Sequence, residues 1–201
     1  MMVANNNITF CSYNAKNYDP IPIKYNIIKE LFEKCDFLLL QETWLIEKEF
    51  IRKFKNDFSN SECISASKMD LDGIKAGRPY GGVAICYHSY LKCQVEHITT
   101  NSKSICALKI NINDINFMLI NVYMPSSDKM EGLDEYTNIL QEVSSICIQS
   151  STQNLIIGGG WNTDIGRNDQ RTRLLKDIIL HENRINALEF DISIVPCTYF
   201  F

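Results

Sequence analysis

The chain has 201 residues, of which 45% are hydrophobic and 22% charged, with 9 Gly and 5 Pro. This balance excludes disordered, collagen-like and coiled-coil proteins and provides enough apolar material for a large core. The net charge of -4, from 20 Lys and Arg against 24 Asp and Glu, gives no overall basic field that would attract nucleic acid. A nucleic-acid partner would need a local basic patch or a metal ion to offset its phosphate charge.

Eight cysteines are scattered along the chain, and no two of them form a Cys-x-x-Cys pair. Most stand in apolar runs such as 83–86, which is typical of small core residues in a reducing compartment. Residues 1–7 lack the basic and apolar regions of a signal peptide, and the longest apolar runs, such as 37–40, are too short to span a bilayer. We therefore expect an intracellular protein, cytoplasmic or nuclear, with no membrane association.

The first sixty residues alternate between strand-like and helix-like patterns. A strand is predicted over 8–14, where an apolar run ends in a polar residue. Pro20 and Pro22 then open a segment whose apolar residues recur at helical spacing. The continuous apolar run at 37–40 favours a buried central strand, and a further helix is predicted over about 46–58.

The middle of the chain changes to short β-type runs separated by turn signals. These runs lie at 63–66, 82–87, 92–98, 105–110 and 117–123. Beyond them, residues 132–148 predict an amphipathic helix, 155–157 a buried strand, and about 170–180 a last helix. Three glycines at 158–160 follow that strand and allow a second interpretation as a phosphate-binding loop, although they lack the Gly-Lys-Ser/Thr sequence of such loops.

These elements predict the fold class. Strands that follow helices indicate parallel crossover connections, whereas the middle of the chain indicates an antiparallel meander. The expected fold is therefore α/β (α+β), with two packed mixed β-sheets flanked by helices in a four-layer α/β/β/α sandwich. Because the chain contains no repeat, linker or low-complexity segment, we expect a single domain over residues 1–201.

Polar side chains stand where three of the predicted strands end. Asn14 ends the first strand, Glu42 follows the buried central strand, and Asn162 follows the glycines. Ligand sites in open α/β sheets lie beyond the carboxyl ends of the strands. Each candidate also has a simpler interpretation, because Asn14 suits a turn and a strand-end Glu42 can face solvent. Tyr123, in the strand-like run before Pro125, can likewise be an aromatic at the edge of the core.

Five motifs in order along the chain favour the functional interpretation. They lie at 12–14 (Ser-Tyr-Asn), 40–43 (Leu-Gln-Glu-Thr), 77–84 (Gly-Arg-Pro-Tyr-Gly-Gly-Val-Ala), 121–125 (Asn-Val-Tyr-Met-Pro) and 156–164. Together they resemble the endonuclease/exonuclease/phosphatase superfamily, which has the deoxyribonuclease I-like fold. The third motif, with the Gln-Glu-Thr-Trp and Asn-Val-Tyr-Met-Pro forms, is similar more narrowly to endonuclease domains of non-long-terminal-repeat retrotransposons. The resemblance covers nearly the whole chain.

The resemblance implies a Mg²⁺-dependent phosphodiesterase that nicks DNA for retrotransposon integration, in a protein once fused to a reverse transcriptase. Glu42 then corresponds to the carboxylate that binds the metal, and Asn14 to a residue that assists at the metal and the phosphate. Tyr123 corresponds to a residue that contacts the phosphate or helps to arrange the transition state. Asn162 corresponds to one that donates a hydrogen bond to the developing charge or orients the attacking water. The metal supplies the positive charge that an acidic protein needs to handle a polyanion.

The sequence departs from the family pattern at two places. Gly160 occupies the position of a catalytic aspartate in the family motif Gly-Asp-Phe-Asn, and the nearest carboxylate downstream is Asp164. The family also carries a terminal Ser-Asp-His, which supplies a general base and its orienting carboxylate. This chain ends at Phe201 after a strand-like segment at 197–200, and its three histidines match none of those positions. We therefore expect a domain that lacks its C-terminal strands and has lost most of its catalysis.

Two other functions remain open from the sequence. One is a phosphatase of a sugar- or lipid-phosphate on the same fold. The other is a non-catalytic domain that binds nucleic acid or a protein partner. Basic residues near the last predicted helix are interspersed with acidic ones, which is typical of a solvated helix face. These basic residues are Arg167, Arg171, Arg173, Lys176 and Arg184.

Overall fold

The computed structural model describes residues 8–18, 22–69, 80–126, 130–150, 152, 154–164 and 166–181. Its first half contains the elements β1 (Phe10–Asn14), α1 (Pro22–Lys34), β2 (Phe37–Gln41), α2 (Glu47–Asp57), β3 (Ser61–Ala66) and β4 (Val83–His88). Its second half contains β5 (Cys93–Ile98), β6 (Ile105–Ile112), β7 (Ile115–Tyr123), α3 (Met130–Gln149), β8 (Leu155–Gly160), α4 (Gln170–Leu175) and the π-helical turn η2 (Lys176–His181).

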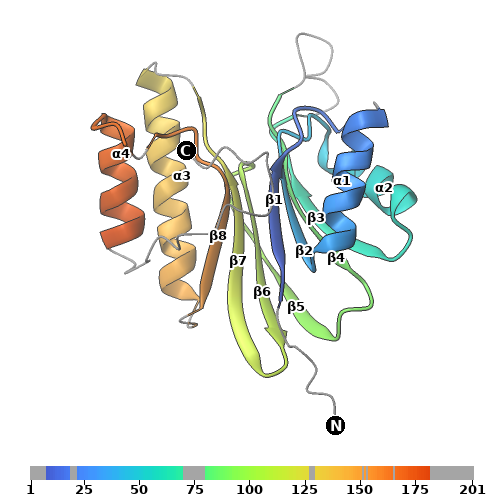
Figure 1. The fold of residues 1–201 in the computed structure, drawn as a ribbon. Coiled ribbons are helices and arrows are strands. Elements are labelled where there is room, and N and C mark those ends of the chain that lie inside the picture. The colour runs from blue at the N-terminus through green and yellow to red at the C-terminus, as the bar shows by residue number, and fades with distance from the viewer. Residues whose placement is uncertain are drawn as a thin grey trace.

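The strands form two four-stranded sheets, with the orders β1-β2-β4-β3 and β5-β6-β7-β8. Each sheet is mixed, because β1 pairs with β2 and β7 with β8 in parallel, while the other neighbours are antiparallel. Helices α1 and α2 cover the outer face of the first sheet, and α3 and α4 cover that of the second (Figure 1). The structure therefore confirms the predicted α/β sandwich with two packed sheets between helices.

Strand β2 shows why its sequence is continuously apolar. All five of its residues are buried, since helices cover one face of its sheet and the second sheet covers the other. Successive side chains point to opposite faces, so Leu38 and Leu40 pack toward the helices while Phe37 and Leu39 pack between the sheets. The ring of Phe37 meets that of Phe117, from the second sheet, edge to face with centroids 6.0 Å apart.

Strand β8 continues through all three glycines rather than ending before them, so the interpretation of 158–160 as a phosphate-binding loop is wrong. Gly158, Gly159 and Gly160 pair in register with the last residues of β7. A side chain at Gly158 would bring its Cβ within 2.7 Å of Leu39 Cδ2, on the facing sheet. The glycines therefore permit a close approach between the two sheets at this edge.

The last predicted helix is divided in two. The side chain of Asp169 caps α4 by accepting a hydrogen bond from Thr172 N at 2.9 Å, and η2 continues the helix with wider turns. The prediction of a solvated basic face is wrong for Arg171. Its side chain is buried, with the guanidinium carbon 5.4 Å from the centre of the Tyr136 ring.

Several expectations concern residues outside the described ranges. These are the Gly77–Pro79 part of the third motif, Arg184, the strand-like segment at 197–200 and the expected loss of C-terminal strands. Within the described ranges, none of the helices combines the length and the apolar character needed to cross a membrane.

Candidate functional site

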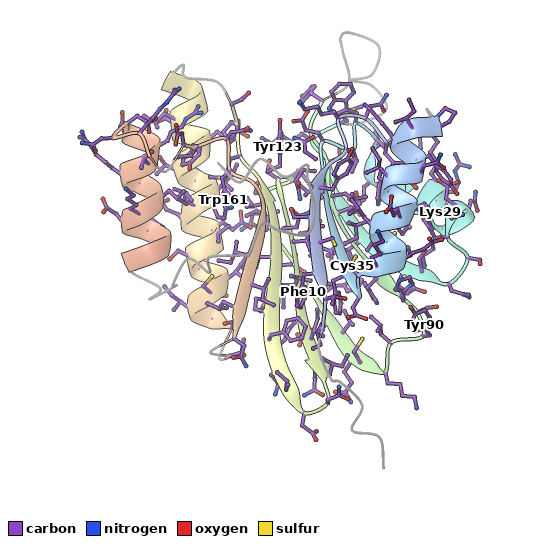
Figure 2. The ribbon with its side chains drawn as sticks, viewed as in Figure 1. Phe10, Lys29, Cys35, Tyr90, Tyr123 and Trp161 are labelled. Carbon is purple, nitrogen blue, oxygen red and sulfur yellow. The ribbon has the colours of Figure 1, made fainter. Side chains whose placement is uncertain are left out.

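Four strands direct their carboxyl ends to the same edge of the sandwich. In the first sheet, Asn14 pairs with Gln41, so β1 and β2 end side by side. In the second sheet, Gly160 pairs with Tyr123, so β7 and β8 also end together. Figure 2 shows Tyr123 at this end, between the two sheets. The residues predicted from the strand ends are thus brought to one edge, with both sheets contributing.

Four of the predicted residues lie together at the strand ends, and we call them the strand-end cluster: Asn14, Glu42, Tyr123 and Asn162. Asn14 Nδ2 donates to Glu42 Oε1 at 2.7 Å. The hydroxyl of Tyr123 lies near enough to Glu42 and Asn162 for both side chains to influence its pKa. Asn14 and Glu42, which are 28 positions apart in the chain, lie at the ends of β1 and β2 in the first sheet. Tyr123 and Asn162 lie at the ends of β7 and β8 in the second sheet, so the cluster includes residues from both sheets. Gly160, the fifth predicted residue, lies beside Tyr123 and contributes no side chain.

The environment of Tyr123 keeps its hydroxyl protonated. Burial, followed by the negative charge of Glu42 and the hydrogen bond to that carboxylate, raises the pKa of Tyr123 to about 12, against a smaller opposite effect of Asn162. The phenol therefore remains a neutral hydrogen-bond donor across the physiological pH range. It can donate to a carboxylate or, when an anion occupies the site, to that anion.

The loop after β2 holds Glu42 in an unusual backbone conformation. Glu42 has a φ of 52° and Trp44 a φ of 55°, in the left-handed region that non-glycine residues rarely adopt. The carbonyl of Glu42 accepts a hydrogen bond from Asn17 N at 2.8 Å, and Thr43 N donates to Gly82 O at 3.3 Å. Backbone strain of this kind persists only where the surroundings enforce it, and it concentrates at functional sites.

A buried polar pair supports the cluster from below, and sequence reasoning missed it as a functional element. Gln41 Nε2 donates to Asn121 Oδ1 at 2.8 Å, which links the two sheets. Asn121 Nδ2 in turn donates to the carbonyls of Leu40 and Ala84 at 2.9 and 2.8 Å. Both amides are almost fully buried and hydrogen-bonded, as buried polar groups need to be. The sequence did contain a signal for this pair, because Gln41 directly precedes Glu42 and Asn121 lies two residues before Tyr123.

The segment that carries Asn162 is anchored from three sides. Asn162 Nδ2 donates to Met124 O at 2.6 Å, and Arg171 Nη1 donates to the carbonyl of Asn162 at 3.4 Å. The next residue, Thr163, hydrogen-bonds through its hydroxyl to that of Tyr136 on α3 at 2.7 Å. Contacts from α3 and α4 therefore hold the backbone of Asn162 and Thr163 beside the end of β7.

Asp164, the nearest carboxylate after Gly160, is engaged within its own turn. Its Oδ1 accepts a hydrogen bond from Gly166 N at 2.9 Å, and its Oδ2 lies 3.2 Å from Arg167 Nε. At Gly160 itself, an added Cβ would lie 3.0 Å from Tyr123 Cδ2, so a side chain there would press on the ring of that tyrosine. The described contacts therefore place Glu42 as the carboxylate of the strand-end cluster.

The donor groups of the cluster suit a weakly held Mg²⁺ ion. Mg²⁺ prefers hard oxygen ligands and keeps several water molecules, so one carboxylate can serve as its protein anchor. Glu42 offers that carboxylate, oriented by the amide nitrogen of Asn14, whose amide oxygen accepts a hydrogen bond from Lys16 N at 3.1 Å. Within the described ranges, no group of three or more His, Cys, Asp or Glu side chains is arranged to hold a metal.

Comparison with known proteins identifies the fold through solved structures. No family model and no curated protein matches the sequence. The catalytic domain of human Nocturnin matches with a TM-score of 0.62 and 12% identity, over 84% of this chain and 69% of that one. An AP endonuclease from Archaeoglobus fulgidus matches with a TM-score of 0.59 and 15% identity, over 86% and 70%. The endonuclease domain of TRAS1, a telomere-specific non-LTR retrotransposon, matches with a TM-score of 0.57 and 15% identity, over 85% and 72%.

These matches confirm that the chain has the fold of the endonuclease/exonuclease/phosphatase proteins, one of which is named by that family in a Bacteroides thetaiotaomicron structure. Other structures with this fold are D. rerio TDP2 complexed with a single-strand DNA product and the Neisseria 3′ phosphatase NExo bound to a product DNA hairpin. The chain spans 66% of a humanized D. rerio TDP2, so it corresponds to about two thirds of that structure.

Proposed function

We propose that the strand-end cluster is a divalent-metal site that binds a phosphodiester of DNA, and that this chain hydrolyses it poorly. The observation that supports the proposal most directly is the gathering of Asn14, Glu42, Tyr123 and Asn162 at the strand ends. The shared fold adds support, since nucleases and phosphatases possess it and two of their structures contain DNA.

Each residue of the cluster has a role in this proposal. Glu42 holds Mg²⁺ through its carboxylate, and Asn14 orients that carboxylate through its hydrogen bond. When bound, the metal neutralises charge on the phosphate and on the leaving oxygen. Tyr123, protonated because of its raised pKa, donates a hydrogen bond to a phosphate oxygen. Asn162 positions that hydroxyl and offers its own amide to the phosphate or to an attacking water.

The low activity follows from Gly160. In the family that the motifs resemble, the corresponding position is an aspartate that orients or activates the attacking water, and glycine can do neither. Groups of this kind typically contribute about 10² to 10⁴-fold to the rate. Asp164 is held by Gly166 and Arg167, and moving its carboxylate to the cluster would break both contacts.

The retroelement part of the proposal has narrower support. The Gln-Glu-Thr-Trp sequence at 41–44 and the residues after Tyr80 belong to the motifs that resemble retrotransposon endonucleases. The TRAS1 endonuclease domain, from a non-LTR retrotransposon, shares the fold. On this basis we propose that the substrate is the DNA target site that is nicked for retrotransposon integration. We also propose that proteins of this family carry the domain fused to a reverse transcriptase.

DNA binding with and without metal tests the site independently of catalysis. Fluorescence anisotropy of a labelled DNA hairpin should show binding that tightens when Mg²⁺ is added to the unmodified chain. The same Mg²⁺ dependence should be absent from Glu42→Gln, which keeps the shape of the side chain and removes its charge. Mg²⁺-dependent binding that persists undiminished in Glu42→Gln would refute the assignment of Glu42.

Plasmid nicking tests the proposed loss of activity. The unmodified chain should convert supercoiled plasmid to the nicked form no faster than a buffer control, with either Mg²⁺ or Mn²⁺. Robust nicking that disappears in Glu42→Gln would support the site and contradict the role assigned to Gly160.

A further inference from the structure

A cavity of about 470 Å³ opens beside the strand-end cluster, with Glu42 and Tyr123 in its wall. Pockets that bind small organic groups have volumes of about 300 to 1,000 Å³. A ligand that is held through a phosphate at the cluster can therefore extend into this cavity. Besides Tyr123, the wall contains two aromatic residues and two lysines, namely Trp44, Tyr80, Lys68 and Lys103.

The two aromatic residues are fixed on adjoining backbone segments. Trp44 N donates to Gly81 O at 3.0 Å, and Tyr80 directly precedes that glycine. Trp44 has a φ of 55°, which is rare for a bulky residue. The side chain of Tyr80 is 60% exposed, unusually open for a large aromatic residue. Exposed aromatic rings in a groove are the usual stacking surfaces for unpaired bases.

The two lysines place positive charge at the same cavity. Lys68 pairs with Glu135, which also lines the cavity, and Lys103 lies 3.9 Å from Glu47. Ion pairs between exposed side chains contribute little stability, so an incoming phosphate can replace the carboxylate partner of a lysine. The cavity thus combines stacking surfaces with cations, next to the residues that would hold a phosphodiester.

We propose that this cavity binds one unpaired nucleotide of single-stranded DNA, adjacent to the phosphate at the strand-end cluster. Its base stacks on Trp44 and Tyr80, and its far phosphate contacts Lys103. The choice of DNA rests on the proposed function. A base inside a duplex has both faces covered by its neighbours and is not available for such stacking. The cavity therefore favours single-stranded over double-stranded DNA.

Trp44 itself reports on this proposal. The chain has only two tryptophans, so a Trp161→Phe variant leaves Trp44 as the one source of tryptophan fluorescence. An oligothymidine of twelve nucleotides, titrated into this variant in the presence of EDTA, should quench the fluorescence of Trp44. A duplex of the same length should quench it less at equal concentration.

Matched substitutions in the Trp161→Phe background identify the wall. Tyr80→Ala and Lys103→Ala should each weaken binding roughly tenfold, whereas Tyr80→Phe, which keeps the ring, should retain it. Tyr90→Ala is the control for the aromatic ring, because Tyr90 is 66% exposed and lies at the other end of the sheets (Figure 2). Lys29→Ala is the control for Lys103→Ala. The Nζ atom of Lys29 lies 3.9 Å from Glu33 Oε1, the same distance as between Lys103 Nζ and Glu47 Oε2, and the two lysine side chains are similarly exposed.

Absence of quenching by the oligothymidine would overturn the proposal. Stronger quenching by the duplex, or equal losses in the control variants, would also overturn it. Because the titration is done without metal, its outcome does not depend on a metal bound at Glu42. Quenching in EDTA, together with DNA binding that does not depend on Glu42, would support the cavity and reject the metal site. No quenching in EDTA, together with Mg²⁺-dependent DNA binding that requires Glu42, would reject the cavity and support the metal site.

Discussion

At the scale of single residues, the strand-end cluster is a set of polar groups whose properties depend on one another. Glu42 accepts a hydrogen bond from Asn14, and both Glu42 and Asn162 influence the pKa of Tyr123. Asn14, Glu42 and Asn162 could be predicted because each follows an apolar run that had to be a strand. Gln41 and Asn121 could not be recognised as a supporting pair, because only the packing of two sheets brings residues 80 positions apart into contact.

The titration of Tyr123 tests this mutual dependence. Absorbance at alkaline pH, compared between the unmodified chain and Tyr123→Phe, should assign to Tyr123 a pKa of about 12. In Glu42→Gln the pKa of Tyr123 should fall, because a neighbouring negative charge and its hydrogen bond are lost. A folded-state pKa above the unfolded value of about 10 means that the unfolded chain releases this proton first. The contribution of Tyr123 to the free energy of unfolding should therefore be fully present below about pH 10 and should disappear as the pH rises toward 12.

Substitution of Gly160 tests whether a second carboxylate completes the metal site. Gly160→Asp should tighten Mg²⁺ binding roughly tenfold, since Mg²⁺ sites commonly use one or two carboxylates. The Cβ of the new side chain lies 3.0 Å from Tyr123 Cδ2, so the ring has to shift by a few tenths of an ångström. Gly160→Asn has the same shape without the charge and serves as the control. Calorimetric affinities that are equal for the two variants would show that the position does not face the metal.

At the scale of elements, the sequence predicted the order and type of almost every helix and strand, because their hydrophobic periods are clear. It did not predict the full length of β8, since three consecutive glycines carry no periodicity and more often mark a loop. It also predicted one helix where α4 and η2 now stand, because a π-helical turn has no distinct sequence pattern. The differences lie next to the site, where glycines and anchoring contacts outweigh local propensity.

A pair of glycine substitutions tests the close approach at β8. Gly159 has a φ of 138°, and an added Cβ would lie 1.9 Å from Val122 O. Gly159→Ala should therefore lower the free energy of unfolding by about 3 kcal/mol or more. Gly81 also has a positive φ, of 68°, but nothing lies within 4 Å of an added Cβ. Gly81→Ala should cost only about 1 to 2 kcal/mol of conformational strain. Similar costs in urea denaturation would contradict the proposed crowding at Gly159.

At the scale of the whole molecule, the two sheets share an apolar core. Residues of β2 and β4 pack between the sheets against residues of β6 and β7, including the contact of Phe37 with Phe117. The site lies at one edge of this core, so its geometry depends on both sheets being folded together. The acidic chain, with a net charge of -4, brings no overall attraction for DNA, which leaves a metal ion and the lysines of the cavity to provide it.

We propose from this shared core that residues 1–201 form a single domain. Thermal unfolding should then give one transition, with the same midpoint by far-UV circular dichroism and by tryptophan fluorescence. Phe37→Ala should lower that midpoint for both probes together, because its ring contacts both sheets. Two separated transitions would show that the sheets unfold as independent units.

The most direct test of the central claim, that the strand-end cluster binds a divalent metal through Glu42, uses paramagnetic Mn²⁺. Titrated into isotope-labelled protein, Mn²⁺ should broaden the side-chain amide resonances of Asn14 and Asn162 before others, and should leave the backbone amide of Tyr90 sharp. An excess of Mg²⁺ should restore the signals, and Glu42→Gln should abolish the broadening. Broadening that centres elsewhere in the molecule, or that persists around Asn14 and Asn162 in Glu42→Gln, would contradict the account.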